Sequence, residues 1–128
     1  MAPSPAVPIG KVASMWLFTP EGFFSVVTAE EFGHPLMVRA RCADDLDQLR
    51  DTHFPELGDT VRIRGRDYPV RAFTTHDDMA ACMARVVRAI DYSNFKSTVS
   101  ARQGYTRAHI YGDVWRDCLQ IETEEGAT

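Results

Sequence analysis

The sequence of 128 residues has no long apolar run, only three cysteines and nothing that looks like an export signal. No segment approaches the ~18 consecutive apolar residues of a membrane-spanning helix. The first ten residues lack a charged region followed by an apolar one. The cysteines are odd in number and far apart, which indicates free thiols in a reducing compartment. We therefore expect a cytoplasmic protein that does not contact a membrane.

Several kinds of catalytic and metal site are also missing from the sequence. The four histidines and three cysteines show no zinc-ligand spacing. There is no glycine-rich phosphate loop and no serine in a nucleophile elbow, and no pair of acids has a clear catalytic spacing. Cys42, facing inward on an expected strand, and Cys82, on an apolar helix stripe, are predicted to be small core residues. These absences predict no metal and no cofactor, and they favour a protein that is not an enzyme.

The composition is that of an ordinary globular domain. Apolar residues make up 45% of the chain and charged residues 25%, and the length fits one domain with a single core. Residues 1–14 are rich in proline and lack an apolar period, so they are predicted to be a disordered arm. Residues 15–121 are predicted to be the domain, and residues 122–128 an acidic tail that frays.

Alternating and helical patterns divide the domain into strands and helices. We expect a β-hairpin of strands 15–19 and 23–28 around the turn Pro20-Glu21-Gly22, and further strands at 36–42, 60–64 and 68–75. Helices are expected near 44–52, 77–90, 95–99 and 108–119. The most regular is 77–90, where Met79, Cys82, Met83, Val86, Val87 and Ile90 recur at helical spacing and Thr75 stands at the cap position.

This order predicts an α+β fold, a mostly antiparallel five-stranded sheet with helices on one face. The elements from Leu36 to Ile90 make up most of a ferredoxin-like unit, which is one form that the sheet can take.

Charge is unevenly distributed along the chain. The formal net charge is −4, which argues against a protein that coats bulk DNA. Residues 85–116, however, carry six cations against Asp91 and Asp113. Twelve of the fourteen cations are arginines, whose planar groups suit phosphate or carboxylate ligands. The alternative is that arginine is simply frequent in a GC-rich coding sequence.

Arginines also recur on the expected strands. Arg39 and Arg41 share one strand face, Arg62 and Arg64 another, and Arg71 lies on a third strand. If these faces coincide, up to five guanidinium groups gather on one side of the sheet, where they would suit a phosphorylated ligand or single-stranded RNA. In the alternative interpretation the arginines pair with acids of the first helix, which are Asp44, Asp45 and Asp47.

A second candidate cluster follows the longest helix. Asn94 and Lys96 stand at a helix start, where free backbone N–H groups and an ammonium can receive an anion. His109 and Tyr111 come thirteen and fifteen residues after Lys96. His109 is the one candidate for general acid or base chemistry. The alternative is that Asn94 is only a helix cap and Tyr111 a core or rim residue.

Several strings between residues 15 and 120 together form a recognisable pattern: Trp16-Leu-Phe-Thr, Gly22-Phe-Phe-Ser-Val-Val, Val38-Arg-Ala-Arg, Asp67-Tyr68 with Arg71-Ala72, Ile90-Asp-Tyr-Ser-Asn-Phe-Lys96, and His109 with Tyr111 and Val114-Trp115. The pattern resembles a family of small bacterial and phage proteins that has no assigned activity, and the string from Ile90 to Lys96 is its most specific part. The resemblance implies a compact domain that stands alone.

We therefore predict a small cytoplasmic domain that binds a phosphorylated ligand, either nucleotide-like or a short RNA. The predicted ligand-binding residues are Arg39, Arg41, Arg71, Asn94, Lys96, His109 and Tyr111. One alternative is a homo-oligomeric interaction module, with a homodimer as its simplest form. A second alternative is a small hydrolase centred on His109.

Overall fold

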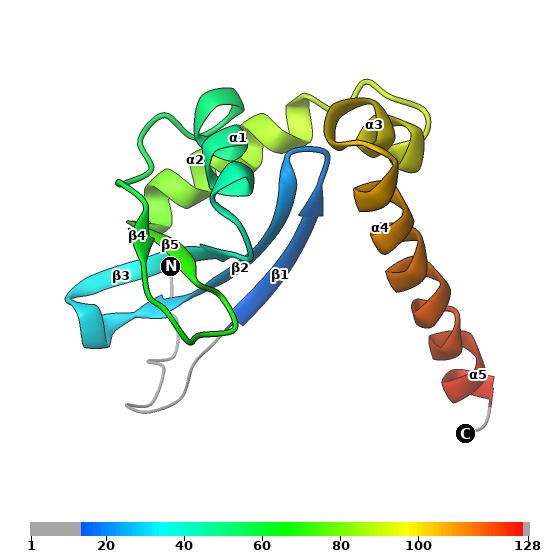
Figure 1. Cartoon of the computed structure of the whole chain (residues 1–128), viewed down its shortest axis with the longest axis horizontal. Helices are drawn as coiled ribbons and strands as arrows, with labels where there is room; N and C mark the ends of the chain where they lie inside the picture. Colours follow the sequence, from blue (N-terminus) through cyan, green and yellow to red (C-terminus); the bar gives the residue numbers. More distant parts are fainter. Residues whose placement is uncertain (1–13, 127–128) are drawn as a thin grey trace, which may run out of the picture.

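The computed structural model describes residues 14–126, which form a five-stranded antiparallel sheet and a set of helices (Figure 1). The predicted α+β class and antiparallel sheet are confirmed. The strands lie in the order β1-β2-β3-β5-β4. Their bounds are β1 Ser14–Thr19, β2 Gly22–Ala29, β3 His34–Ala40, β4 Val61–Arg62 and β5 Val70–Thr74. The helices are the short 3-10 turn η1 Glu30–Phe32, α1 Ala43–Thr52, α2 His76–Arg88, α3 Phe95–Gln103, α4 Tyr105–Cys118 and α5 Gln120–Gly126.

Helices α1 and α2 cover one face of the sheet and enclose the main core (Figure 1). Side chains alternate along each strand, so every second residue of β2, β3 and β5 points toward these helices. The buried residues of this core are Phe24, Val26, Val38, Ala40, Leu46, Leu49, Phe54, Leu57, Val70, Ala72, Met79 and Cys82. The residues between them in the strands, among them Arg39 and Arg71, point to the opposite face.

Helices α3 and α4 form a hairpin beside the turn of the β1–β2 hairpin (Figure 1). Val99, Ala108 and Tyr111 form a small core of their own, against which Phe18 and Phe23 pack. Phe18 and Phe23 lie directly opposite each other in the two strands, on the face that α1 and α2 leave uncovered. The C-terminal part of α4 then runs on past the sheet toward α5.

Four details differ from the sequence-based expectations. Helix α2 ends at Arg88, and Val87 and Ile90 are exposed because they fall at the edge of the apolar stripe and beyond the last turn. Strand β3 ends at Ala40, so Cys42 precedes α1 as its cap residue and is not a core residue of a strand.

The other two details lie further along the chain. The strand expected at 60–64 shortens to Val61–Arg62, ahead of a turn in which Gly65 has a positive φ of 76°. The tail expected to fray from residue 122 is helical to Gly126. The expected arm at residues 1–14 lies, apart from Ser14, outside the described residues.

The strand order resembles a ferredoxin-like unit in part. The run β3-α1-β4-β5-α2 has the element order of such a unit, which would end with another strand after α2. Within residues 14–126 no strand follows α2, and β2, which comes before the unit, occupies the position beside β3. The position of β2 matters for the candidate site, because it contributes Ser25 to the open face next to Arg39.

Candidate functional site

The predicted ligand-binding residues fall into three separate places. Arg39 and Arg71 lie on the open face of the sheet, whereas Asn94, Lys96, His109 and Tyr111 line one pocket between α3 and α4. Arg41 contacts neither of these cavities and lines a third, between the sheet and α4. One ligand therefore does not contact all seven residues in this arrangement.

The pairing of β3 with β5 places two guanidinium groups side by side. Arg39 stands directly opposite Arg71 in the antiparallel register. Only 5% of Arg71 is exposed. Its Nη2 donates to the backbone carbonyl of Tyr68 at 3.0 Å, and its Nη1 lies 3.6 Å from the sulfur of Met37. Arg39 donates from Nη2 to the hydroxyl of Ser25 at 2.8 Å.

Neither of these two cations has a carboxylate partner in the described part of the chain. The Nε atoms of Arg39 and Arg71 are both buried without a hydrogen-bond partner. Burial lowers the pKa of Arg71, and the positive charges of Arg39 and Arg66 lower it further. Buried cations are normally paired, because loss of hydration is expensive and like charges repel each other in a sheet. The negative charge of Glu31 acts on the pKa of Arg71 in the opposite direction, but among residues 14–126 no carboxylate lies within ion-pair distance of either arginine.

A cavity of about 390 Å³ opens over this pair of arginines. Phe32 from η1, Arg66 from the β4–β5 turn and Tyr68 contribute to its walls, and Glu31 and Asp67 are the carboxylates at its edge. The Tyr68 ring is covered by two guanidinium groups, since the central carbons of Arg39 and Arg41 both lie 4.4 Å from the ring centroid. Arg41 also donates to the Asp67 carbonyl at 2.7 Å, so it holds Tyr68 in place from the far side of the cavity.

The expected gathering of five arginines on one face occurs only in part. Arg62 is paired opposite Val70, a core residue, and therefore lies on the helix side of the sheet. Arg66 joins Arg39 and Arg71 instead. The alternative pairing with α1 does not occur among residues 14–126: Asp45 pairs with Arg107, and Asp47 pairs with Arg50.

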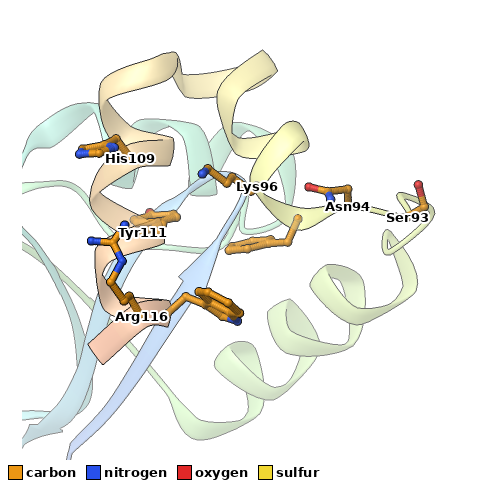
Figure 2. A pocket seen from close by; sticks show the side chains of 9 residues that line it. Ser93, Asn94, Lys96, His109, Tyr111 and Arg116 are labelled. Carbon is orange, nitrogen blue, oxygen red and sulfur yellow. The ribbon is translucent and has the colours of Figure 1, made fainter. Parts of the chain in front are cut away.

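The pocket between α3 and α4 brings the other four predicted residues together (Figure 2). Its volume is about 450 Å³. The side-chain oxygen of Asn94 accepts from the Ser97 N–H at 2.8 Å, so the cap interpretation of Asn94 is confirmed and this oxygen is already engaged. The ammonium of Lys96 lies close to α4, where a Cβ on Gly112 would be in ordinary van der Waals contact with it, 3.6 Å from the nitrogen. Phe95, Trp115 and Arg116 complete the lining.

His109 is not placed as a general base would be. Its side chain is 59% exposed, and its Nε2 lies 4.0 Å from the nearest carboxylate oxygen, on Asp113. That distance is beyond hydrogen-bond reach. His53, by contrast, does contact a carboxylate: its Nε2 lies 3.3 Å from Glu21, whose buried carboxylate also binds Arg102 at 2.7 Å. The sequence held no signal for the ion pair of Glu21 with Arg102, because the two residues are 81 positions apart.

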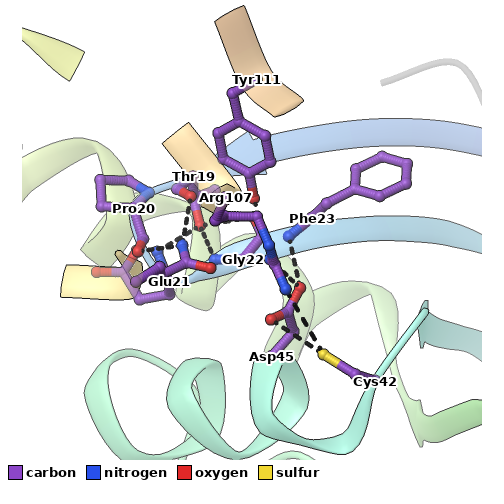
Figure 3. A network of polar contacts seen from close by, with 10 residues as sticks. Thr19, Pro20, Glu21, Gly22, Phe23, Cys42, Asp45, Arg107 and Tyr111 are labelled. Carbon is purple, nitrogen blue, oxygen red and sulfur yellow. Dashed lines mark hydrogen bonds and ion pairs between the residues drawn. The ribbon is translucent and has the colours of Figure 1, made fainter. Parts of the chain in front are cut away.

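A second buried carboxylate, Asp45, joins α1 to the β-hairpin and to α4 (Figure 3). It accepts from the Phe23 N–H at 3.0 Å and from Arg107 at 2.7 Å. This contact raises the pKa of the Arg107 guanidinium. Arg107 also reaches the Tyr111 hydroxyl at 3.4 Å, and burial raises the pKa of that phenol. The network is fully paired, which indicates a structural role, and sequence reasoning missed it.

No family model, no curated protein and no solved structure matches this chain. The resemblance to a bacterial and phage family therefore stays a prediction. In the stretch from Ser14 to Gly126, no helix is long and apolar enough to cross a bilayer. The same stretch has no cluster of three or more histidine, cysteine or acidic side chains that could hold a metal ion.

Proposed function

We propose that this protein binds a phosphorylated ligand in the cavity over Arg39 and Arg71. The observation that carries the proposal is a pair of adjacent guanidinium groups, Arg71 buried and Arg39 half-buried, with no carboxylate partner in the described chain. An anion in the cavity that both residues line would place a negative charge beside their guanidinium groups. Guanidinium groups bind phosphate through two parallel hydrogen bonds, which gives both strength and orientation.

The cavity favours a ligand of the size of a nucleotide. About 390 Å³ lies within the range of small-molecule sites, which is roughly 300–1,000 Å³. Phe32 stands at its edge, with its ring centroid 5.9 Å from the central carbon of Arg71 and much of its surface exposed. An exposed ring beside a phosphate site suits stacking by a base. A mononucleotide and a short RNA both carry the phosphate group that the arginines would bind, and both are candidate ligands.

Binding measurements with one matched pair of variants test this proposal. The ligands are inorganic phosphate, a panel of mononucleotides and a short single-stranded RNA, each measured by isothermal calorimetry at two salt concentrations. Arg71→Met removes the charge from the cavity, and Arg62→Met removes the same charge from the other face of the sheet. We expect at least one of these ligands to bind, and we expect its affinity to fall as the salt concentration rises. Arg71→Met should lower the affinity at least about tenfold, whereas Arg62→Met should leave it unchanged.

The pocket between α3 and α4 provides an internal comparison. Because Lys96 lies outside the cavity of Arg39 and Arg71, Lys96→Met should leave the affinity unchanged. Equal losses on Arg71→Met and Arg62→Met would show a merely electrostatic attraction, and binding of none of the three ligand types would rule the proposal out. A loss confined to Lys96→Met would move the site to the α3–α4 pocket.

A further inference from the structure

Tyr68 is a wall that two cavities share. The cavity over Arg39 and Arg71 lies on one side of it, and a second cavity, also of about 390 Å³, lies on the other side, between the sheet and α4. The Tyr68 ring is stacked between the guanidinium groups of Arg39, which lines the first cavity, and Arg41, which lines the second. We call these three side chains the Tyr68 ridge. The ridge separates the two cavities and places one cation beside each of them.

The second cavity, which we call the Trp16 cavity, is mostly aromatic. Trp16 and Phe18 line it from β1, Phe23 from β2 and Tyr111 from α4. The rings of Phe18 and Phe23 are stacked with their centroids 4.5 Å apart, and Trp16 meets Phe23 edge to face at 5.8 Å. Trp16 is 64% exposed, so much of its ring surface is free. An exposed aromatic ring in a cavity suits stacking by another planar ring.

The Trp16 cavity has one cation without a carboxylate partner. In the described part of the chain its charged lining residues are Arg41, Asp45 and Arg107. Asp45 and Arg107 pair with each other at 2.7 Å, so their charges are balanced. Arg41 forms no ion pair among residues 14–126, and its guanidinium group donates to a backbone carbonyl, that of Asp67. The charge that remains in this cavity is therefore positive, and it stands at the ridge, on the side facing away from Arg39.

We infer that one ligand crosses the Tyr68 ridge and occupies both cavities, and that this ligand is a single nucleic-acid strand of at least two nucleotides. The inference rests on the proposed function, which assigns a phosphate to Arg39 and Arg71. The next nucleotide of the strand brings its phosphate to Arg41 and its base to Trp16. Proteins that bind single strands combine cations along the backbone with aromatic rings on which successive bases stack. Each side of the ridge provides both, since Phe32 stands in the first cavity as Trp16 stands in the second.

Two ligands that differ by one nucleotide test the inference by isothermal calorimetry. They are adenosine 5′-monophosphate and the 5′-phosphorylated dinucleotide of adenosine. We expect the dinucleotide to bind at least about tenfold more tightly, because only it reaches the Trp16 cavity. Trp16→Ala should remove this gain and leave the affinity for the mononucleotide unchanged. Trp115→Ala, the matched control, removes a tryptophan that is 68% exposed and lines neither cavity, and it should change neither affinity.

Tryptophan fluorescence reports the stacking directly. The chain has two tryptophans, so Trp115→Phe leaves Trp16 as the only one. In this variant the dinucleotide should quench the emission and the mononucleotide should not, because only the dinucleotide places a base on Trp16. The phosphate contact is tested with Arg41→Met, which should weaken binding of the dinucleotide more than that of the mononucleotide. Arg64→Met removes an exposed cation that lines neither cavity and should affect neither ligand.

The results distinguish a failure of this inference from a failure of the proposed function. Mononucleotide binding that depends on Arg71, together with an equal affinity for the dinucleotide, would overturn the inference and leave the proposed function standing. A dinucleotide gain that survives Trp16→Ala, equal quenching by both ligands, or no binding of the dinucleotide would also overturn the inference. Dinucleotide binding that Arg71→Met leaves unchanged would contradict the proposed function, and the inference with it.

Discussion

Arg71 combines features that seldom occur together in one side chain. It is almost fully buried, it faces another arginine across two strands, and its only hydrogen-bond acceptors among residues 14–126 are a carbonyl oxygen and a thioether sulfur. A buried group that only maintains the fold is expected to be fully paired. Among residues 14–126 no carboxylate forms an ion pair with it, so we expect Arg71 to lower the stability of the free protein.

The stability of the free protein therefore provides a prediction that is independent of ligand. Arg71→Met removes the repulsion with Arg39 and the cost of burying a charge, and it keeps an apolar side chain of similar length beside Met37. The lost hydrogen bond to the Tyr68 carbonyl offsets part of this gain, typically by about 1 kcal/mol. In urea titrations without phosphate, the free energy of unfolding should stay within about 1 kcal/mol of wild type or rise. A fall of several kcal/mol would show that Arg71 is a structural residue.

The cysteines provide a second prediction at this scale. Cys82 is fully buried among core residues, and burial raises the pKa of its thiol to about 11. Cys118 is exposed on α4. Since only the thiolate reacts, a short iodoacetamide treatment at pH 8 should modify Cys118 and leave Cys82 unmodified. Peptide mass spectrometry measures both, and rapid modification of Cys82 in the folded protein would contradict its placement in the core.

How much of the site was predictable differs from residue to residue. Alternation predicted that Arg39 and Arg41 share a strand face, because the side-chain period of a strand is two, but β3 ends at Ala40 and Arg41 lies just beyond it. Alternation could not show that Arg71 stands opposite Arg39, since that depends on which strands pair and in which register. The contacts of Glu21 and Asp45 join residues far apart in sequence, so no local pattern could have predicted them.

At the scale of elements, Asp45 on α1 reaches both β2 and α4, and α1 and α4 share no hydrophobic core among the described residues. Its carboxylate receives the Phe23 N–H at the start of β2 and the Arg107 guanidinium from α4. The approach is so close that a Cβ on Gly22 would lie 2.6 Å from the Asp45 carboxyl carbon. A glycine at the hairpin is therefore required by contact with α1, in addition to its role in the turn.

Replacing this carboxylate tests the link. Asp45→Asn keeps the volume of the side chain and an acceptor for Phe23, but it leaves Arg107 without its anion. Because Arg107 remains partly exposed, we expect the free energy of unfolding to fall by about 2–3 kcal/mol, toward the low end for a broken buried ion pair. Asp47→Asn breaks only an exposed pair with Arg50 and should cost less than about 0.5 kcal/mol. Equal effects of the two variants would contradict a structural role for the network.

Most elements were predictable because their patterns are local. The β1–β2 hairpin follows from its turn residues, and the start of α2 follows from Thr75, whose hydroxyl accepts from the Asp78 N–H at 3.1 Å. The ends of elements were less predictable. Helix α2 stops before Ile90 and β3 stops before Cys42, because packing against neighbouring elements sets these boundaries and the apolar pattern does not.

At the scale of the whole molecule, the two cavities lined by most of the predicted residues belong to different parts. The cavity of Arg39 and Arg71 is built by the sheet, η1 and the β4–β5 turn. The pocket of Lys96 and His109 lies between α3 and α4. The two cavities share no lining residue, so variants in one are controls for binding in the other.

The ion pairs that join these two parts have a mechanical consequence. Helices α3 and α4 meet the rest of the molecule through Phe18 and Phe23 and through the contacts of Arg102 with Glu21 and of Arg107 with Asp45. Both carboxylates lie near the turn of the β1–β2 hairpin, so α3 and α4 are attached to the rest of the molecule close to that turn. A small rotation there moves the tip of α5 much further than the base. Such a rotation would displace α5 and leave the sheet, with the cavity over Arg39 and Arg71, unchanged.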